Sequence, residues 1–191
     1  MDASGASNLP PHFSRLSRNT ETSLLQRAGQ VRSEEPEEYK MWSISSRNLQ
    51  ASDQLVLEIE KWAGKNGKFI YAIQAKPGMS PQKIRQTFVD ASDRMKRDGR
   101  KCSRLNEKHV ADSWLYVGRS EKLHSRMKEH FGHGSKSTYS LQMIHWSESL
   151  ELQLELHCAR YREDIHDLVL QSLEDQLWDD LRPMFGRRGP R

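Results

Sequence analysis

Hydrophobic and polar residues alternate strictly from position 150 to position 158, with an apolar side chain at every even number. A period of two predicts a β-strand with one face in the core and the other in water. Residues 69–73 are instead a short continuous apolar run between Gly67 and Pro77-Gly78, which is typical of a strand buried on both faces. Residues 114–117 form a further apolar run that ends at Gly118 and predicts another strand. The pattern therefore predicts three strands.

Apolar positions that recur every three or four residues predict four helices around these strands. The predicted helices cover residues 52–63, 81–99, 120–131 and 163–181. Gly64 and the Asn66-Gly67 pair end the first of them. Ser80 and Pro81 start the second, because serine caps a first turn and proline fits its first position. Alternating helices and strands predict a small α/β domain on a short sheet.

The first forty residues show neither period. They are rich in Ser, Asn, Pro and charge, and their apolar residues are too scattered for a stable amphipathic element. We therefore expect residues 1–40 to form a flexible or partner-ordered arm and residues 41–66 to form a helical extension. Residues 67–191 then form the main domain, with a helical insertion at about residues 76–112 between the first two strands.

The composition is that of a heavily solvated chain: of the 191 residues, 35% are hydrophobic and 29% are charged. No apolar run approaches the roughly 20 residues that a membrane helix needs, and the first residues lack the apolar core of a signal peptide. Cys102 and Cys158 have no metal-ligand spacing, so we expect thiols in a reducing compartment. These features predict a cytoplasmic protein with no membrane partner.

Glu174 is the residue that fits its surroundings least. On a helix it shares a face with four apolar residues, which are Leu170, Leu177, Trp178 and Leu181. A carboxylate in an apolar stripe costs several kcal/mol unless a partner or a metal ion compensates its charge. Two interpretations remain open. One is a partly exposed acid paired with an arginine, and the other is a carboxylate with a chemical role.

Four further side chains carry candidate chemistry. Tyr71 lies in the first strand, and Tyr116 lies in the second strand, on the face that it shares with Trp114. Arg126 and His130 are one helical turn apart on the next helix. Each residue alone is usually structural or solvated. Together with a buried carboxylate they supply a metal ligand, a cation for a phosphate and groups that move a proton, as phosphodiester hydrolysis requires.

A basic segment lies inside the insertion. Residues 94–108 contain seven Lys or Arg and only two acidic residues. Clustered positive charge beside a hydrolytic site would follow a phosphate backbone. The alternative is a solvated helical flap. The nucleic-acid contacts predicted in this segment are Arg94, Arg97, Arg100, Lys101 and Arg104.

The order and spacing of the candidate residues resemble those of the GIY-YIG nuclease family. The first motif reads Phe-Ile-Tyr at 69–71 in place of Gly-Ile-Tyr, and the second reads Tyr-Val-Gly at 116–118. Arg126 follows the second tyrosine by ten residues, His130 comes one turn later, and Glu174 lies on a late helix. An ordered set of matches is more specific than either tyrosine motif alone.

The resemblance covers roughly residues 67–189 and implies the family fold, a three-stranded antiparallel sheet flanked by helices. It implies that Glu174 is the protein ligand of a single Mg²⁺ ion, with Mn²⁺ as an alternative. It also implies that Arg126 contacts the scissile phosphate of DNA, where its charge would stabilise the transition state.

The same resemblance implies roles for the remaining residues. Tyr71 and Tyr116 would position or deprotonate the attacking water, and His130 would assist through hydrogen bonds. Arg119, directly after the second motif, and Lys122 would contact the phosphate backbone.

Two departures from the family pattern bear on function. Tyr71 and Tyr116 are 45 residues apart (116 − 71), which reflects the insertion. Many members carry an Asn after the proline that follows the catalytic Glu, whereas Pro183 is followed here by Met, Phe and Gly. The proline and glycine of the turn are kept, and the amide is absent.

Three hypotheses follow. The first is a metal-dependent DNA endonuclease, either site-specific like a restriction enzyme or specific for branched DNA, with a homodimer as a candidate assembly. The second, motivated by the absent Asn, is a nucleic-acid-binding module that keeps the fold without turnover and binds DNA in a salt-sensitive way. The third is a purely structural interaction protein, which requires every motif match to be a coincidence.

Overall fold

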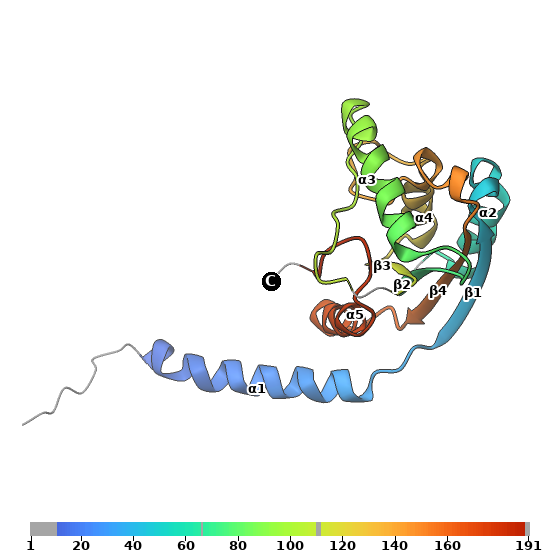
Figure 1. Ribbon diagram of the computed structural model, residues 1–191. Helices are drawn as coiled ribbons and strands as arrows, with labels where there is room; N and C mark the ends of the chain where they lie inside the picture. The colour runs from blue at the N-terminus through green and yellow to red at the C-terminus, as the bar shows by residue number, and fades with distance from the viewer. Residues whose placement is uncertain (1–10, 66, 110–111, 190–191) are drawn as a thin grey trace, which may run out of the picture. The chain divides into compact units, whose positions relative to one another are not determined.

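The computed structural model of the chain describes residues 11–65, 67–109 and 112–189. Within them the chain forms a four-stranded antiparallel sheet flanked by helices (Figure 1). The strands are β1 (Glu38–Ser45), β2 (Lys68–Ala75), β3 (Trp114–Ser120) and β4 (Gln153–Tyr161), and their order in the sheet is β1-β4-β2-β3. The predicted α/β class is confirmed, and the prediction of three strands is wrong.

The α-helices are α1 (Pro11–Ser33), α2 (Asp53–Ala63), α3 (Pro81–Arg97), α4 (Leu123–Phe131) and α5 (Asp167–Leu181), with short 3₁₀ helices η1 (Ser46–Ala51), η2 (Met143–His145) and η3 (Glu148–Leu150). Four of the five described α-helices, α2 to α5, begin and end close to the predicted positions. The Ser80 hydroxyl accepts a hydrogen bond from the Lys83 amide at 3.2 Å, which confirms the predicted cap. Helix α5 starts later than expected because the His166 side chain caps it.

The additional strand, β1, lies where we predicted the end of the arm and the start of a helical extension. Trp42 and Ile44 are buried on its inner face, while Tyr39 and Met41 on the other face are exposed. Trp42 pairs with Leu156 of β4. The helical prediction for residues 41–66 is therefore wrong over 41–45, because a short alternating segment gains its burial from a partner strand far along the chain.

The N-terminal unit, up to Glu34, separates from the rest of the chain by its contacts and is described by itself. Residues 11–33 form the single helix α1, where we predicted an arm without a stable element. Its described side chains are mostly exposed, Leu24 and Leu25 among them. Local bonds support it, such as that from Arg27 Nε to the Ser23 carbonyl at 3.2 Å.

Some predicted features lie outside the described residues. They are positions 1–10 of the arm, position 66 of the first helix stop, positions 110–111 of the insertion and positions 190–191 of the main domain. In the part of the chain that the structure describes, none of the helices is long and apolar enough to cross a membrane.

The two faces of the sheet pack against different helices. Helices α3 and α4 lie on one side of the sheet and α5 lies on the other (Figure 1). Tyr71 is in the main core with Phe69 and Ile73. A bulge between the Ile73 and Gln74 pairings places Tyr116 opposite Ile73 and Trp114 opposite Gln74. Tyr116 and Trp114 therefore lie on opposite faces, and the prediction of a shared face is wrong.

The segment after α5, residues 183–186, runs beside β3. The Met184 amide donates to the Trp114 carbonyl, and the Phe185 amide donates to the Leu115 carbonyl, both at 2.9 Å. The Phe185 ring is fully buried, with its centroid 4.4 Å from that of Phe88. These contacts anchor the C-terminal segment in the core of the main domain.

We predict that Phe185→Ala lowers the free energy of unfolding by about 3–5 kcal/mol, because it leaves a cavity among packed aromatic rings. Urea unfolding measures the change. Leu57→Ala is the control, since Leu57 is 56% exposed and its loss should change stability by less than about 0.5 kcal/mol. Equal effects of the two substitutions would show that the C-terminal segment is not anchored.

Candidate active site

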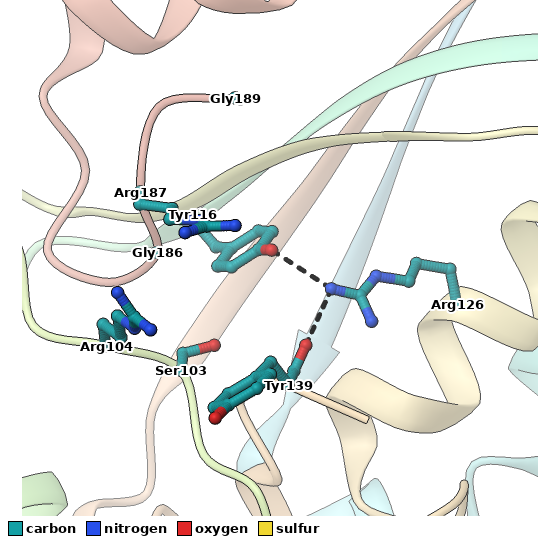
Figure 2. Close-up of a pocket in the computed structure, with 8 residues that line it drawn as sticks. All are labelled: Ser103, Arg104, Tyr116, Arg126, Tyr139, Gly186, Arg187 and Gly189. Carbon is teal, nitrogen blue, oxygen red and sulfur yellow. Dashed lines mark hydrogen bonds between the residues drawn. The ribbon is translucent and has the colours of Figure 1, made fainter. Parts of the chain in front are cut away.

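Arg126 on α4 is the centre of a hydrogen-bond network that joins three parts of the domain. Its Nε donates to the Tyr71 hydroxyl at 3.1 Å. Its Nη2 donates to the Tyr116 hydroxyl at 3.1 Å and to the Tyr139 carbonyl at 3.0 Å, two bonds that Figure 2 shows. Its Nη1 pairs with Glu129 at 2.6 Å. The guanidinium is thus fixed in position with every nitrogen bonded, and its side chain is only 18% exposed.

His130 holds Tyr71 from the other side. Its Nδ1 accepts a hydrogen bond from the Leu141 amide at 3.3 Å, so in the neutral ring the proton is on Nε2. Nε2 then donates to the Tyr71 hydroxyl at 3.0 Å. His130 is fully buried, and burial, with the nearby charge of Arg126, holds its pKa well below the usual value. It is therefore a neutral hydrogen-bond donor near pH 7.

Tyr71 packs directly on the backbone of β3. It is 1% exposed and pairs with Gly118 across the sheet, and a Cβ at that position would lie 2.6 Å from the Tyr71 hydroxyl oxygen. Only glycine leaves room for the ring, which explains the residue that closes the second motif. Burial raises the pKa of Tyr71, although Arg126 opposes the shift, so Tyr71 is a neutral phenol.

Glu174 is largely buried on α5, with 14% of its side chain exposed. Arg119 Nε lies 3.3 Å from its Oε2, and Gln171 Nε2 donates to the same oxygen at 3.1 Å. Its Oε1 takes part in none of the hydrogen bonds or ion pairs found within residues 11–65, 67–109 and 112–189. Burial raises the pKa of Glu174 to about 7 against the opposing effect of Arg119, so its charge is only partly compensated.

The five predicted catalytic residues divide between the two faces of the sheet. Tyr71, Tyr116, Arg126 and His130 meet on the face toward α4. Arg119 pairs with Ile70 and so lies with Glu174 on the face toward α5. The two groups are still electrostatically coupled. Burial raises the pKa of Glu174, Arg119 opposes this increase, and the charge of Arg126 on the other face also lowers the pKa.

The predicted nucleic-acid contacts differ in their surroundings. Those exposed to solvent are Arg94, Arg97, Lys101, Arg104 and Lys122. Arg94 donates to the His145 carbonyl at 3.0 Å, and half-buried Arg100 donates to the Gln142 side chain at 3.3 Å, so both also support loop structure. Arg104 is the member of this set that lines the same pocket as Tyr116.

A pocket of about 250 Å³ opens beside Tyr116 and Arg126. It is lined by Ser103, Arg104, Tyr116, Arg126, Tyr139, Gly186, Arg187 and Gly189 (Figure 2). Tyr139 and Arg187 were not predicted from the sequence, because both lie in segments without a helical or strand period. The basic Gly-Arg-Arg-Gly run at 186–189 was the available signal for Arg187.

The ligands available for a metal ion are few. In the described part of the chain, no three or more His, Cys, Asp or Glu side chains gather where they could hold an ion. Glu174 offers a single hard oxygen site. A partly hydrated Mg²⁺ ion that uses one or two carboxylates fits this donor set, whereas a metal enclosed by protein ligands does not.

Comparisons of the chain with protein-family models, with curated proteins and with solved structures found no match. The function is therefore argued from the geometry and electrostatics of the residues described above.

We predict that Gly118→Ala destabilises the domain by about 1–3 kcal/mol, because the new Cβ would overlap the Tyr71 hydroxyl. Urea unfolding measures the loss. Pairing Gly118→Ala with Tyr71→Phe, which removes the overlapping oxygen, should restore part of the stability. A lack of any such coupling would contradict the described contact.

A second prediction concerns pH. The pKa of Glu174 is about 7 in the fold against about 4.3 in an unfolded chain, so the folded state binds the proton more tightly. Stability should therefore fall as pH rises from about 4.3 to about 7. Glu174→Gln should remove about 2 kcal/mol of the stability difference between pH 5 and pH 8, measured by urea unfolding in EDTA. Asp180→Asn, an exposed change on the same helix, should keep that difference.

Proposed function

We propose that this chain is a metal-dependent DNA endonuclease of the GIY-YIG type, which hydrolyses phosphodiester bonds. The observation that carries the proposal is the meeting of Tyr71, Tyr116, Arg126 and His130 in one hydrogen-bond network. These four residues come from three separate elements, and the resemblance selected them by sequence order alone. A purely structural protein has no need for this combination of side chains beside a pocket lined by arginines.

Arg126 is the proposed contact to the scissile phosphate. Its guanidinium lies in the pocket wall and is held by two tyrosine hydroxyls and a carbonyl. A cation fixed before the substrate arrives stabilises charge on a phosphate without reorganising during the reaction. Partial burial strengthens this effect, because less water competes for the phosphate oxygens.

The two tyrosines receive different roles in this proposal. Tyr71 is buried and neutral, so it orients Arg126 and takes no part in proton transfer. Tyr116 is half-buried and lines the pocket, where its hydroxyl can contact a water molecule beside the phosphate. His130, a neutral donor, gives a hydrogen bond to the Tyr71 hydroxyl and so fixes its position. We therefore assign the positioning of the attacking water to Tyr116.

Glu174 is the proposed ligand of the Mg²⁺ ion, with Mn²⁺ as the alternative. Its Oε2 is held by Arg119 and Gln171, and its raised pKa of about 7, caused by burial, marks a carboxylate that a further cation would stabilise. When bound, the ion would activate water and offset charge on the phosphate. Arg119 and Gln171 keep the carboxylate in one orientation.

DNA is the proposed substrate because of the charge distribution around the pocket. Two exposed basic side chains from the segment after α3 lie in the same region: Arg104 lines the pocket, and Lys101 Nζ lies 5.4 Å from the centroid of the Tyr139 ring. They extend the positive surface beyond the network, as a duplex or a branched junction requires. A preference for plasmid over branched oligonucleotides would indicate site-specific cutting, and the opposite preference would indicate branch-specific cutting.

We predict cleavage of plasmid or branched oligonucleotides in Mg²⁺ and none in EDTA. Glu174→Ala and Arg126→Ala should each lower the single-turnover rate by at least about 100-fold, the usual effect of losing one group that stabilises the transition state. Asp180→Ala, exposed on the same helix as Glu174, is the matched control and should cut like the wild type. A wild-type cleavage rate in the Glu174 or the Arg126 variant would contradict the role proposed for that residue.

A non-catalytic DNA-binding module is the second candidate, and the Arg119–Glu174 ion pair favours it. In such a module the arginine would compensate the carboxylate permanently, and no ion would be needed. This candidate predicts no cutting of any substrate in Mg²⁺ or Mn²⁺, together with a mobility shift that weakens steeply with salt.

A further inference from the structure

Arg104 and Arg187 point to a feature of the pocket that the proposed chemistry does not use. Figure 2 shows both side chains on the Tyr116 side of the pocket, while Arg126 enters from the other side. The described lining residues include three arginines and neither an aspartate nor a glutamate. The Ser103 hydroxyl and the Tyr139 side chain complete a wall of hydrogen-bonding groups.

The charges of these arginines are balanced differently. Arg126 forms an ion pair with Glu129 at 2.6 Å. Arg104 and Arg187 are exposed and take part in no ion pair within the described residues. The neighbouring Arg188, in contrast, is held by Asp175 and Asp179. Two uncompensated guanidinium groups therefore face one small pocket.

The backbone holds the two residues next to each other. The Gly186 amide donates to the Arg104 carbonyl at 2.8 Å, which joins the residue before Arg187 directly to the other arginine. Leu105 and buried Phe185 form an antiparallel bridge next to that bond. Gly186 has φ +101°, a left-handed conformation that lets the chain turn Arg187 toward Tyr116.

We propose that Arg104 and Arg187 form a phosphate-binding subsite beside Tyr116, separate from the contact that Arg126 makes. An arginine fork matches the geometry of phosphate oxygens, and two forks can share one phosphate group. The phosphate is that of a nucleotide next to the cleaved bond in a DNA strand, an assignment of source that rests on the proposed function. The subsite fixes the position of the strand relative to Arg126.

The test measures binding of a fluorescently labelled single-stranded 12-mer to the full chain in EDTA, by anisotropy at several salt concentrations. Arg104→Gln and Arg187→Gln should each lower the affinity about 5- to 20-fold at low salt. Each should also reduce the slope of log K against log salt by about 1, the share of one phosphate contact. Lys61→Gln, an exposed change on α2 outside this pocket, should stay within about twofold of the wild type.

Two further arms identify the source of the phosphate. Inorganic phosphate at millimolar concentration should compete with the 12-mer only weakly if the subsite takes a strand phosphate, and strongly if it takes a free phosphate. A series of 12-mers is then prepared, each with one neutral methylphosphonate at a different position. At one position the methylphosphonate should weaken binding to the wild type but not to Arg187→Gln. Weak competition identifies a strand phosphate and strong competition identifies a free phosphate, and either result supports a phosphate subsite.

The subsite and the proposed function fail in distinguishable ways. If both Gln variants bind the 12-mer and inorganic phosphate as tightly as Lys61→Gln does, the subsite is overturned, whatever the cleavage assay shows. If the wild type binds phosphate through these arginines but neither binds nor cuts DNA, the subsite stands and the endonuclease proposal falls. Circular dichroism of each variant verifies that the exposed substitutions leave the fold intact.

Discussion

The buried positive charge of Arg126 is the constraint on which the rest of the site depends. A guanidinium removed from water is tolerated only when its charge is paired and its donors are bonded. Glu129 supplies the charge, and Tyr71, Tyr116 and the Tyr139 carbonyl accept the hydrogen bonds. These requirements bring α4, β2, β3 and the loop at residue 139 together. They also determine which faces of the tyrosines remain available to a substrate.

The sequence was sufficient to predict the parts of the fold that have a regular period. Strands β2, β3 and β4 and helices α2 to α5 appear near their predicted positions because each carries its own apolar pattern. Strand β1 was missed because Trp42 and Ile44 are too few apolar positions to suggest a strand before its partner β4 is known. Helix α1 was missed because its stability depends on local hydrogen bonds and propensity more than on an apolar face.

The candidate site was predictable in its members and less so in its geometry. Motif order selected Tyr71, Tyr116, Arg126 and His130, which the structure brings into one network. The sequence did not reveal that Glu174 lies on the other face of the sheet with Arg119, since this depends on the pairing of β2 with β3. The basic run at 186–189 was the sequence signal for Arg187, but its place beside the pocket depends on the anchoring of Phe185 next to β3.

The strand order has a consequence for synthesis of the protein on the ribosome. The sheet places β4 in its middle, paired with both β1 and β2, so that Glu38 meets Arg160 across the ladder. Most sheet contacts thus join segments far apart along the chain, a topology that folds slowly. A growing chain cannot complete the sheet until β4 has emerged, and Phe185 emerges later still. The pocket is therefore assembled last, and no nascent fragment that stops before residue 185 has a finished site.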